Sequence, residues 1–135
     1  MVDSKRAHAE RRLRDEKIAW LTTVRRDGQP QSSPVWFLWR DGEVVVYSKP
    51  TTQKVRNVQT NRRVSVHLRD VDEGSDIISI EGEATIDERY PQAAAIPAYV
   101  TKYRAMIADL RMDPKSFAGA YSVPIRIRPT RMRID

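Results

Sequence analysis

The sequence predicts a mainly β protein of the α+β class, built as a small antiparallel barrel of six strands with helices around it. Three observations predict this class. Six segments are rich in β-branched and aromatic residues, and most of them alternate apolar and polar positions. Asp27-Gly28 and Asp41-Gly42 join the first three segments as tight hairpins. Gly82, inside the fifth segment, predicts the bulge that lets a sheet curl into a barrel.

Length and composition set the limits of this prediction. The 135 residues, 40% of them hydrophobic, suit one compact domain over residues 1–135. The absence of cysteine excludes disulfides and cysteine-based metal or nucleophile chemistry, and two histidines are too few for a histidine-rich metal site. No apolar run could span a membrane and the polar start lacks a signal-peptide core, so we expect a cytoplasmic protein without a membrane span.

The charge balance favours an anionic partner. Lys and Arg number 24 against 18 Asp and Glu, which gives a formal net charge of +6. A nucleic acid is the less favoured partner, because binders of that kind interleave exposed aromatics with basic residues. Here Trp20, Trp36 and Trp39 lie inside apolar strands instead. We therefore expect a small anionic ligand and no nucleic acid.

The first third of the chain predicts a surface helix followed by two strands. Residues 3–17 carry charges of both signs, which is typical of a solvated helix. Ile18–Val24 predicts the first strand and Gln31–Arg40 the second. The second strand is apolar almost throughout, so both of its faces should be covered. A second copy of the chain is the simplest cover, which predicts a homodimer.

The segment from Glu43 to Asp70 predicts a strand, a short helix and another strand. Glu43–Ser48 is the strand, and Thr52–Thr60 the helix that Asn61 ends. The helix start offers unpaired N–H groups and the positive end of the helix dipole, beside several hydroxyls and cations. They are Ser48, Lys49, Thr51, Thr52, Lys54 and Arg56. This pattern predicts a phosphate site, and a capped helix with a solvated basic face is the alternative that the residues leave open.

The remaining residues predict two strands with a helix between them. A polar loop over residues 71–75 precedes the strand Asp76–Asp87. A helix then follows, with an apolar stripe at steps of three and four: Ile96, Val100, Tyr103, Ile107 and Leu110. Asp113-Pro114 predicts the cap of one further turn, and Ala120–Arg133 closes the sheet.

Several of these segments together carry a family resemblance. They are Asp27–Pro30, Ser33–Phe37, Asp41-Gly42, Ser48, Lys54, Asn57, Asn61–Val64, Glu81–Ala84 and Val123–Arg131. This ordered set resembles the split β-barrel pyridoxamine 5′-phosphate oxidase-like superfamily, and within it the branch that uses the deazaflavin coenzyme F420. The resemblance covers nearly the whole chain. It implies the FMN-binding split-barrel fold and a homodimer that holds its cofactor between the two subunits.

The resemblance also implies a cofactor site. Lys54 and Asn57 would contact the phosphate, with Ser48, Thr52 and Gln53 beside them. Pro34, Val35 and Trp36 would line the ring, and Lys49, Arg56, Arg62 and Arg63 would hold the anionic tail. Flavin-phosphate oxidases of this superfamily place an Arg on the second strand, whereas this chain has no cation there before Arg40, which favours F420 over FMN.

The implied function is that of an F420-dependent oxidoreductase that transfers a hydride between the deazaflavin and a small electron-poor substrate. No dedicated catalytic residue is predicted. Tyr47, His67 and Tyr121 could donate a proton, but isolated residues of this kind are more often ordinary parts of a sheet. An FMN-binding oxidase and an F420 carrier without turnover are the alternatives.

Overall fold

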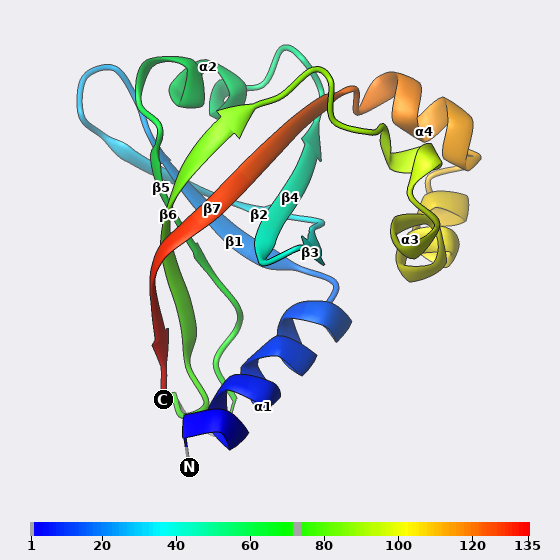
Figure 1. The fold of residues 1–135 in the computed structure, drawn as a ribbon. Helices are drawn as coiled ribbons and strands as arrows, with labels where there is room; N and C mark the ends of the chain where they lie inside the picture. Colours follow the sequence, from blue (N-terminus) through cyan, green and yellow to red (C-terminus); the bar gives the residue numbers. More distant parts are fainter. Residues whose placement is uncertain (1, 72–73) are drawn as a thin grey trace.

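The computed structural model describes residues 2–71 and 74–135 (Figure 1). The described helices and strands are α1 Val2–Asp15, β1 Ala19–Val24, β2 Pro30–Val35, β3 Leu38–Arg40, β4 Glu43–Ser48, α2 Gln53–Thr60, β5 Arg63–His67, β6 Ile78–Ile86, α3 Pro97–Asp109, α4 Pro114–Ala120 and β7 Val123–Ile134, with a 3-10 turn at Ala93–Ala95. The predicted loop over residues 71–75 lies partly outside the described residues. None of the described helices is long and apolar enough to cross a membrane.

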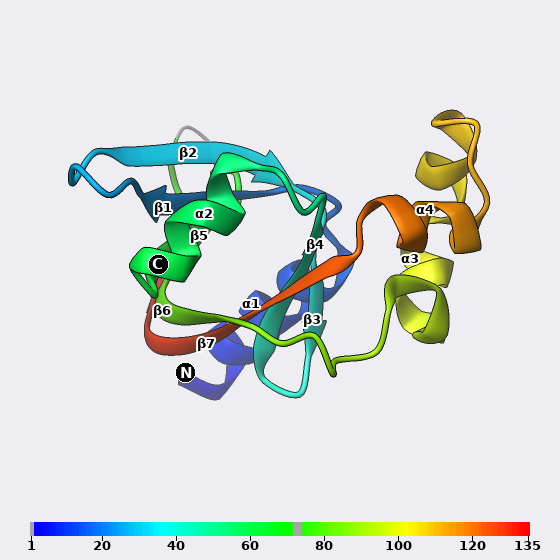
Figure 2. The ribbon, with the colours of Figure 1, turned by 90° about the horizontal axis from the view of Figure 1, so that it is seen from above.

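The strands form one antiparallel sheet in the order β2-β1-β5-β6-β7-β4-β3. Its two edges, β2 and β3, are consecutive in the chain, so the sheet curls back on itself (Figure 2). The α+β split-barrel class predicted from the sequence is therefore confirmed. The described residues contain seven strands instead of six, because the predicted strand over residues 31–40 is broken.

Contacts with α3 cause this break. The amide of Phe37 donates to the hydroxyl of Tyr103 at 2.8 Å, and the carbonyl of Phe37 accepts from Lys102 Nζ at 2.9 Å. Since both backbone groups of Phe37 have side-chain partners, Phe37 can leave the ladder without an unpaired polar group. The continuous strand over 31–40 was the wrong prediction for this reason.

Gly82 confirms the predicted bulge. The register between β6 and β7 shifts at Glu81/Gly82. A Cβ atom at Gly82 would lie 2.7 Å from the carbonyl oxygen of Arg128 and 3.0 Å from Cγ2 of Ile127. The two strands approach so closely there that only glycine fits, and this close approach accompanies the sharp coil of the sheet.

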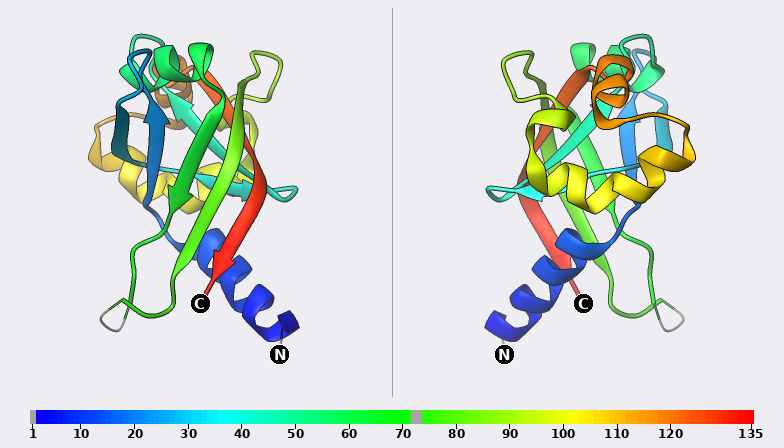
Figure 3. Two further views of the ribbon diagram at one scale, coloured as in Figure 1. Left: turned by 90° about the vertical axis from the view of Figure 1, so that its left-hand side faces the viewer. Right: turned by 90° about the vertical axis from the view of Figure 1, so that its right-hand side faces the viewer.

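Two hydrophobic clusters share strand β4. Val44 and Val46 point into the barrel, where side chains of α1 and α2 also pack, while Val45 and Tyr47 face the second cluster, against α3 and α4. Figure 3 shows these two helices on one side of the barrel. Leu38 packs in the second cluster. Helices α3 and α4 of the same chain thus cover part of the outer barrel surface, for which a second copy was the predicted cover.

The apolar stripe of α3 differs from the prediction at its ends. Ile96, Tyr103 and Ile107 are buried as predicted. Tyr99, which the stripe omitted, is 1% exposed, whereas Leu110 at the C-cap is 45% exposed. The helix turns its Tyr99 face toward Tyr47, whose ring lies edge-on at 5.1 Å. The predicted cap at Asp113 is confirmed, since its side chain accepts from the Ser116 amide at 2.8 Å.

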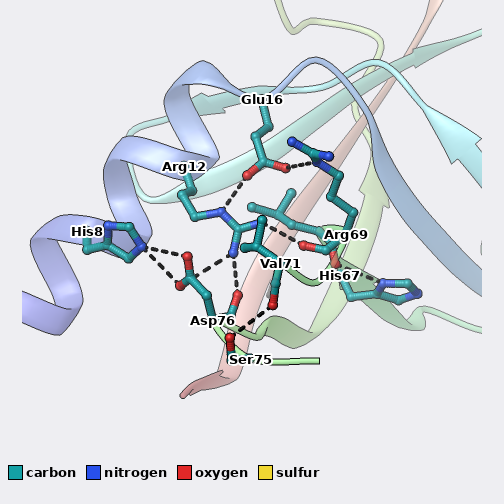
Figure 4. A network of polar contacts seen from close by, with 9 residues as sticks. His8, Arg12, Glu16, His67, Arg69, Val71, Ser75 and Asp76 are labelled. Atoms are coloured by element: carbon teal, nitrogen blue, oxygen red, sulfur yellow. Dashed lines mark hydrogen bonds and ion pairs between the residues drawn. The ribbon is translucent and has the colours of Figure 1, made fainter. Parts of the chain in front are cut away.

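The mixed charges of α1 predicted a solvated helix, but one face of α1 is buried. Ala9 and Leu13 are fully buried, and Arg12 is 9% exposed. The guanidinium of Arg12 donates to the carbonyls of Asp76 and Arg69, so its burial leaves few donors unpaired (Figure 4). These contacts anchor α1 to residues of the segment that lies between β5 and β6.

Candidate functional site

A pocket of about 450 Å³ lies where the ends of β2 and β4 meet the start of α2 and the helices α3 and α4. Most of the predicted cofactor residues line it: Pro34, Val35, Trp36, Ser48, Lys49, Thr52 and Lys54. Tyr47 and Tyr121, two of the weak donor candidates, also line it. The structure therefore brings together a strand end, a turn and a helix start that lie up to twenty residues apart in the sequence.

The turn into α2 leaves the helix start without a side-chain cap. Thr52 is the N-cap residue, but its hydroxyl lies 2.7 Å from the hydroxyl of Ser48 and makes no cap bond. The first turn of α2 contains no acidic residue. The sequence left open a phosphate site or a capped helix with a solvated basic face. The side-chain cap of the second alternative does not form. The amides of this first turn can therefore serve an external anion.

Lys54 is one of two lysines that line this pocket, the other being Lys49. The side chain of Lys54 is half-buried, and burial lowers its pKa below the ordinary value for lysine. In residues 2–71 and 74–135 no acceptor lies within hydrogen-bonding distance of its ammonium group, and no carboxylate pairs with it. A partly desolvated cation without a partner is unfavourable in the ligand-free chain. A bound anion would remove that cost.

Stacked aromatic rings also line the pocket. The ring of Trp36 stacks on Tyr103 at 4.9 Å and on Phe117 at 5.3 Å, with interplanar angles of 4° and 11°. Tyr121 stacks on Phe117 at 4.4 Å, and Lys49 Nζ lies 5.4 Å from the Tyr121 centroid. Neighbouring rings that stack face to face fix each other in place, which gives the pocket a rigid and largely apolar wall.

Asn57 lies behind the pocket and does not line it. Its amide nitrogen donates to Thr23 Oγ1 at 2.9 Å and to Gln31 Oε1 at 3.0 Å. Its amide oxygen accepts from Gln53 Nε2 at 2.8 Å. With these bonds made and only 2% of Asn57 exposed, the residue fastens α2 to β1 and β2. Within this chain these bonds fix α2, the helix that also carries Lys54, against the barrel.

Of the four predicted tail-binding residues, Lys49 lines the pocket, whereas the three arginines lie outside the pocket of their own chain. Arg62 Nη2 donates to Thr85 Oγ1 at 3.1 Å on another side of the barrel. Arg56 donates to the Thr51 carbonyl and to the side chain of Gln53, which is exposed. Arg63 is exposed on β5. One chain does not bring these side chains to Lys54.

The other donor candidates are engaged or distant. The hydroxyl of Tyr47 donates to the Pro91 carbonyl at 2.6 Å, and burial raises its pKa. His67 is exposed and lies away from the pocket, near the loop in Figure 4.

Sequence reasoning missed Tyr99, Leu110 and Phe117, which come from α3 and α4. Helical spacing of apolar residues predicts that a helix has a buried face. It does not predict which part of the barrel that face contacts.

The curled antiparallel sheet with helices on one side defines a split-barrel protein. Residues 6–133 match the family model described as pyridoxamine 5′-phosphate oxidase, and the chain belongs to this family.

Solved structures agree on the fold. An F420 reductase is 24% identical, with a TM-score of 0.68 over 92% of this chain and 94% of the other. A putative pyridoxamine 5′-phosphate oxidase from Listeria innocua is 23% identical, with a TM-score of 0.65 over 98% and 95%. The heme storage protein HutZ from Vibrio cholerae is 15% identical, with a TM-score of 0.65 over 98% and 92%. No curated protein matches the sequence.

Proposed function

We propose that this chain is an F420-dependent oxidoreductase in which the deazaflavin binds in the pocket with its phosphate at Lys54. The observation that carries the proposal is the half-buried ammonium of Lys54, which has no partner among the described residues, beside the uncapped start of α2. A phosphodiester would satisfy both features at once. When bound, a reduced deazaflavin supplies a hydride to an electron-poor substrate, which takes its proton from water.

The residues of the chain bind, orient and shield. Lys54 and the first amides of α2 would hold the phosphate, with Ser48 and Thr52 shaping the turn. Lys49 lies at the pocket beside Tyr121 and would add a second positive charge. Pro34, Val35 and Trp36 would lie along the ring, and the stacked wall behind Trp36 would keep water from one ring face. Positioning of this kind needs no dedicated acid or base.

The absence of a cation on β2 supports F420 over FMN. The terminal phosphate of FMN carries up to two charges and is best held by a guanidinium. Residues 30–39 contain no Lys or Arg, and Gln31 is bonded to Asn57. The phosphodiester of F420 carries one charge, which Lys54 can match. An FMN oxidase and an F420 carrier without turnover remain the rival functions.

A homodimer would complete the site. Large apolar side chains are exposed at Ile18, Trp20 and Leu110, the last of them on the pocket. Arg62 lies outside the pocket of its own chain, so it would reach the anionic tail of F420 only from a second copy. Light scattering on the eluting protein, with and without F420, tests this point. Monomers under both conditions would contradict it.

Titration of the purified chain with F420 and with FMN tests the proposed function. We expect F420 fluorescence to change saturably at micromolar concentrations and FMN to bind more weakly. Tighter binding of FMN would favour the oxidase, and no binding of either would refute both. Stopped-flow oxidation of the bound reduced deazaflavin by a panel of quinones and enones then separates an enzyme from a carrier. No oxidation by any panel member would favour the carrier.

A further inference from the structure

Two lysines from distant parts of the chain meet at one aromatic ring, outside the proposed cofactor pocket. Lys102 Nζ, on α3, donates to the Phe37 carbonyl at 2.9 Å and lies 4.0 Å from the centroid of the Phe37 ring. It also lies 5.3 Å from the centroid of the Tyr103 ring, and Lys17 Nζ lies 5.7 Å from the same centroid. Lys102 does not line the cofactor pocket, so this lysine pair is a separate feature of the molecule.

No carboxylate neutralises the amino group of Lys102 directly. Asp15 and Glu16 act on it through their charge, but neither comes within 4.0 Å of its Nζ in residues 2–71 and 74–135. Glu16 is bonded to Arg12 instead. Ring faces attract a cation, but burial and then the charge of Lys17 lower the pKa of Lys102 to about 8. A lysine that is desolvated and lies beside a second cation is activated as a nucleophile.

The hydrogen bonding of Lys102 fits an amide nitrogen. An ammonium group has three N–H donors, and the Phe37 carbonyl is the one acceptor of Lys102 Nζ among the described residues. An acylated lysine carries one N–H and no charge, so its single donor would match this single acceptor. A neutral imine, which an aldehyde would form, has no N–H and would lose the bond to Phe37. The geometry therefore favours acyl donors over aldehydes.

We propose that Lys102 is a modification site that takes short acyl groups from thioesters. The neutral amine attacks the thioester carbon, a C–N bond forms and the C–S bond breaks. The thiolate leaves with the electron pair and takes up the proton that the nitrogen loses, so nothing is oxidised or reduced. Because Asp15 and Glu16 offset the charges of Lys17 and Lys102, the neighbourhood does not select an anionic acyl donor. The site is independent of F420 and goes beyond the proposed function.

Site-resolved acetylation by a neutral thioester tests the reactivity of Lys102. The purified chain is incubated with S-acetyl-N-acetylcysteamine at pH 8 and at pH 9.5, and peptide mass spectrometry follows each lysine. The chain has no cysteine, so no protein thiol competes for the acyl group. Lys5 and Lys115 are exposed and serve as internal references. The same reaction is run on Lys17→Met and on the control Lys5→Met.

We expect Lys102 to be acetylated about 10-fold faster than Lys5 and Lys115 at pH 8. About half of the Lys102 side chains are neutral at this pH, against well under about 1% for the reference lysine pKa, although an amine of lower pKa is a weaker nucleophile. The advantage should shrink at pH 9.5, where exposed lysines also lose protons. Lys17→Met should slow the acetylation of Lys102, because the second cation is lost, and Lys5→Met should leave it unchanged.

Thermal melts of the acetylated chain test the fit of the acyl group. Acetyl-lysine is placed by genetic code expansion at residue 102 and, as the control, at the exposed residue 115. At pH 7 the Tm of the chain acetylated at Lys102 should equal or exceed that of the wild type. The amide N–H keeps the bond to the Phe37 carbonyl, and the partly desolvated charge is removed. Acetylation of Lys115 should leave the Tm unchanged.

Three results would overturn the inference. They are acetylation of Lys102 at pH 8 that is no faster than that of Lys5 and Lys115, an unchanged rate at Lys102 in Lys17→Met, and a lower Tm for the chain acetylated at Lys102 than for the wild type. None of these measurements involves F420, so their failure would leave the proposed function untouched.

Discussion

Replacement of Lys54 by methionine separates two effects of this side chain: its effect on the stability of the ligand-free chain and its effect on F420 binding. Methionine keeps most of the buried stem and removes the ammonium group. The ligand-free variant should be at least as stable as the wild type, because the lost charge is partly desolvated and has no partner in residues 2–71 and 74–135. F420 binding, in contrast, loses a charge-assisted hydrogen bond.

The expected loss follows from the burial of Lys54. Hydrogen bonds to charged groups contribute about 1.5–3 kcal/mol, and half-burial limits the screening by salt. The Kd for F420 should therefore rise roughly 10- to 150-fold in Lys54→Met. Because the pKa of Lys54 is lowered, wild-type affinity should also fall as the pH rises through that lowered pKa, whereas the affinity of Lys54→Met should lack this step.

Fluorescence titration at fixed ionic strength measures both effects. Lys5→Met is the matched control, since Lys5 is exposed on α1 and its replacement changes the net charge equally. F420 should bind Lys5→Met as it binds the wild type. Unchanged affinity in Lys54→Met, or an equal loss in Lys5→Met, would show that Lys54 is not the phosphate ligand.

Three further predictions concern the fold. Gly82→Ala should destabilise the chain by about 2–3 kcal/mol in urea unfolding, because its Cβ would overlap a backbone carbonyl, whereas Gly119→Ala, with open space around it, should be neutral or stabilising. Burial lowers the pKa of Lys102 to about 8, so between pH 8 and 10 the unfolded chain binds more protons than the folded chain. The stability of the wild type should therefore rise with pH in this range relative to that of Lys102→Met, and parallel curves of stability against pH would contradict this. The hydrogen bond from His8 lowers the pKa of Asp76, so the stabilisation from the ionised Asp76 is present above about pH 4 and lost below it. The Tm of Asp76→Asn should therefore depend less on acid pH than the Tm of the wild type, and an equal dependence would refute the role of this contact.

Local signals allowed much of the fold and of the pocket floor to be predicted from the sequence. Gly82 signals a bulge by its own conformational and steric properties, and Asp41-Gly42, with φ of 54° and 74°, specifies its turn within two residues. Lys54 could be placed at a helix start beside a strand end because β4, Pro50 and α2 follow one another within the eighteen residues from Glu43 to Thr60; that this place holds an anion stays a prediction.

Features that depend on distant residues could not be predicted in this way. The break at Phe37 exists because Tyr103 and Lys102, 66 and 65 residues further along, bind its backbone groups. Asn57 shares a helix with Lys54, yet Thr23 on β1 and Gln31 on β2 draw its side chain away from the pocket. Periodicity identifies a buried helix face, but it does not reveal what that face contacts.

A crystal structure of the chain grown with F420 tests the central claim most directly. We expect the phosphate of the deazaflavin within hydrogen-bonding distance of Lys54 Nζ and the first amides of α2, with the ring beside Trp36. Binding of F420 at another surface, with Lys54 still unpartnered, would contradict the assignment of this pocket.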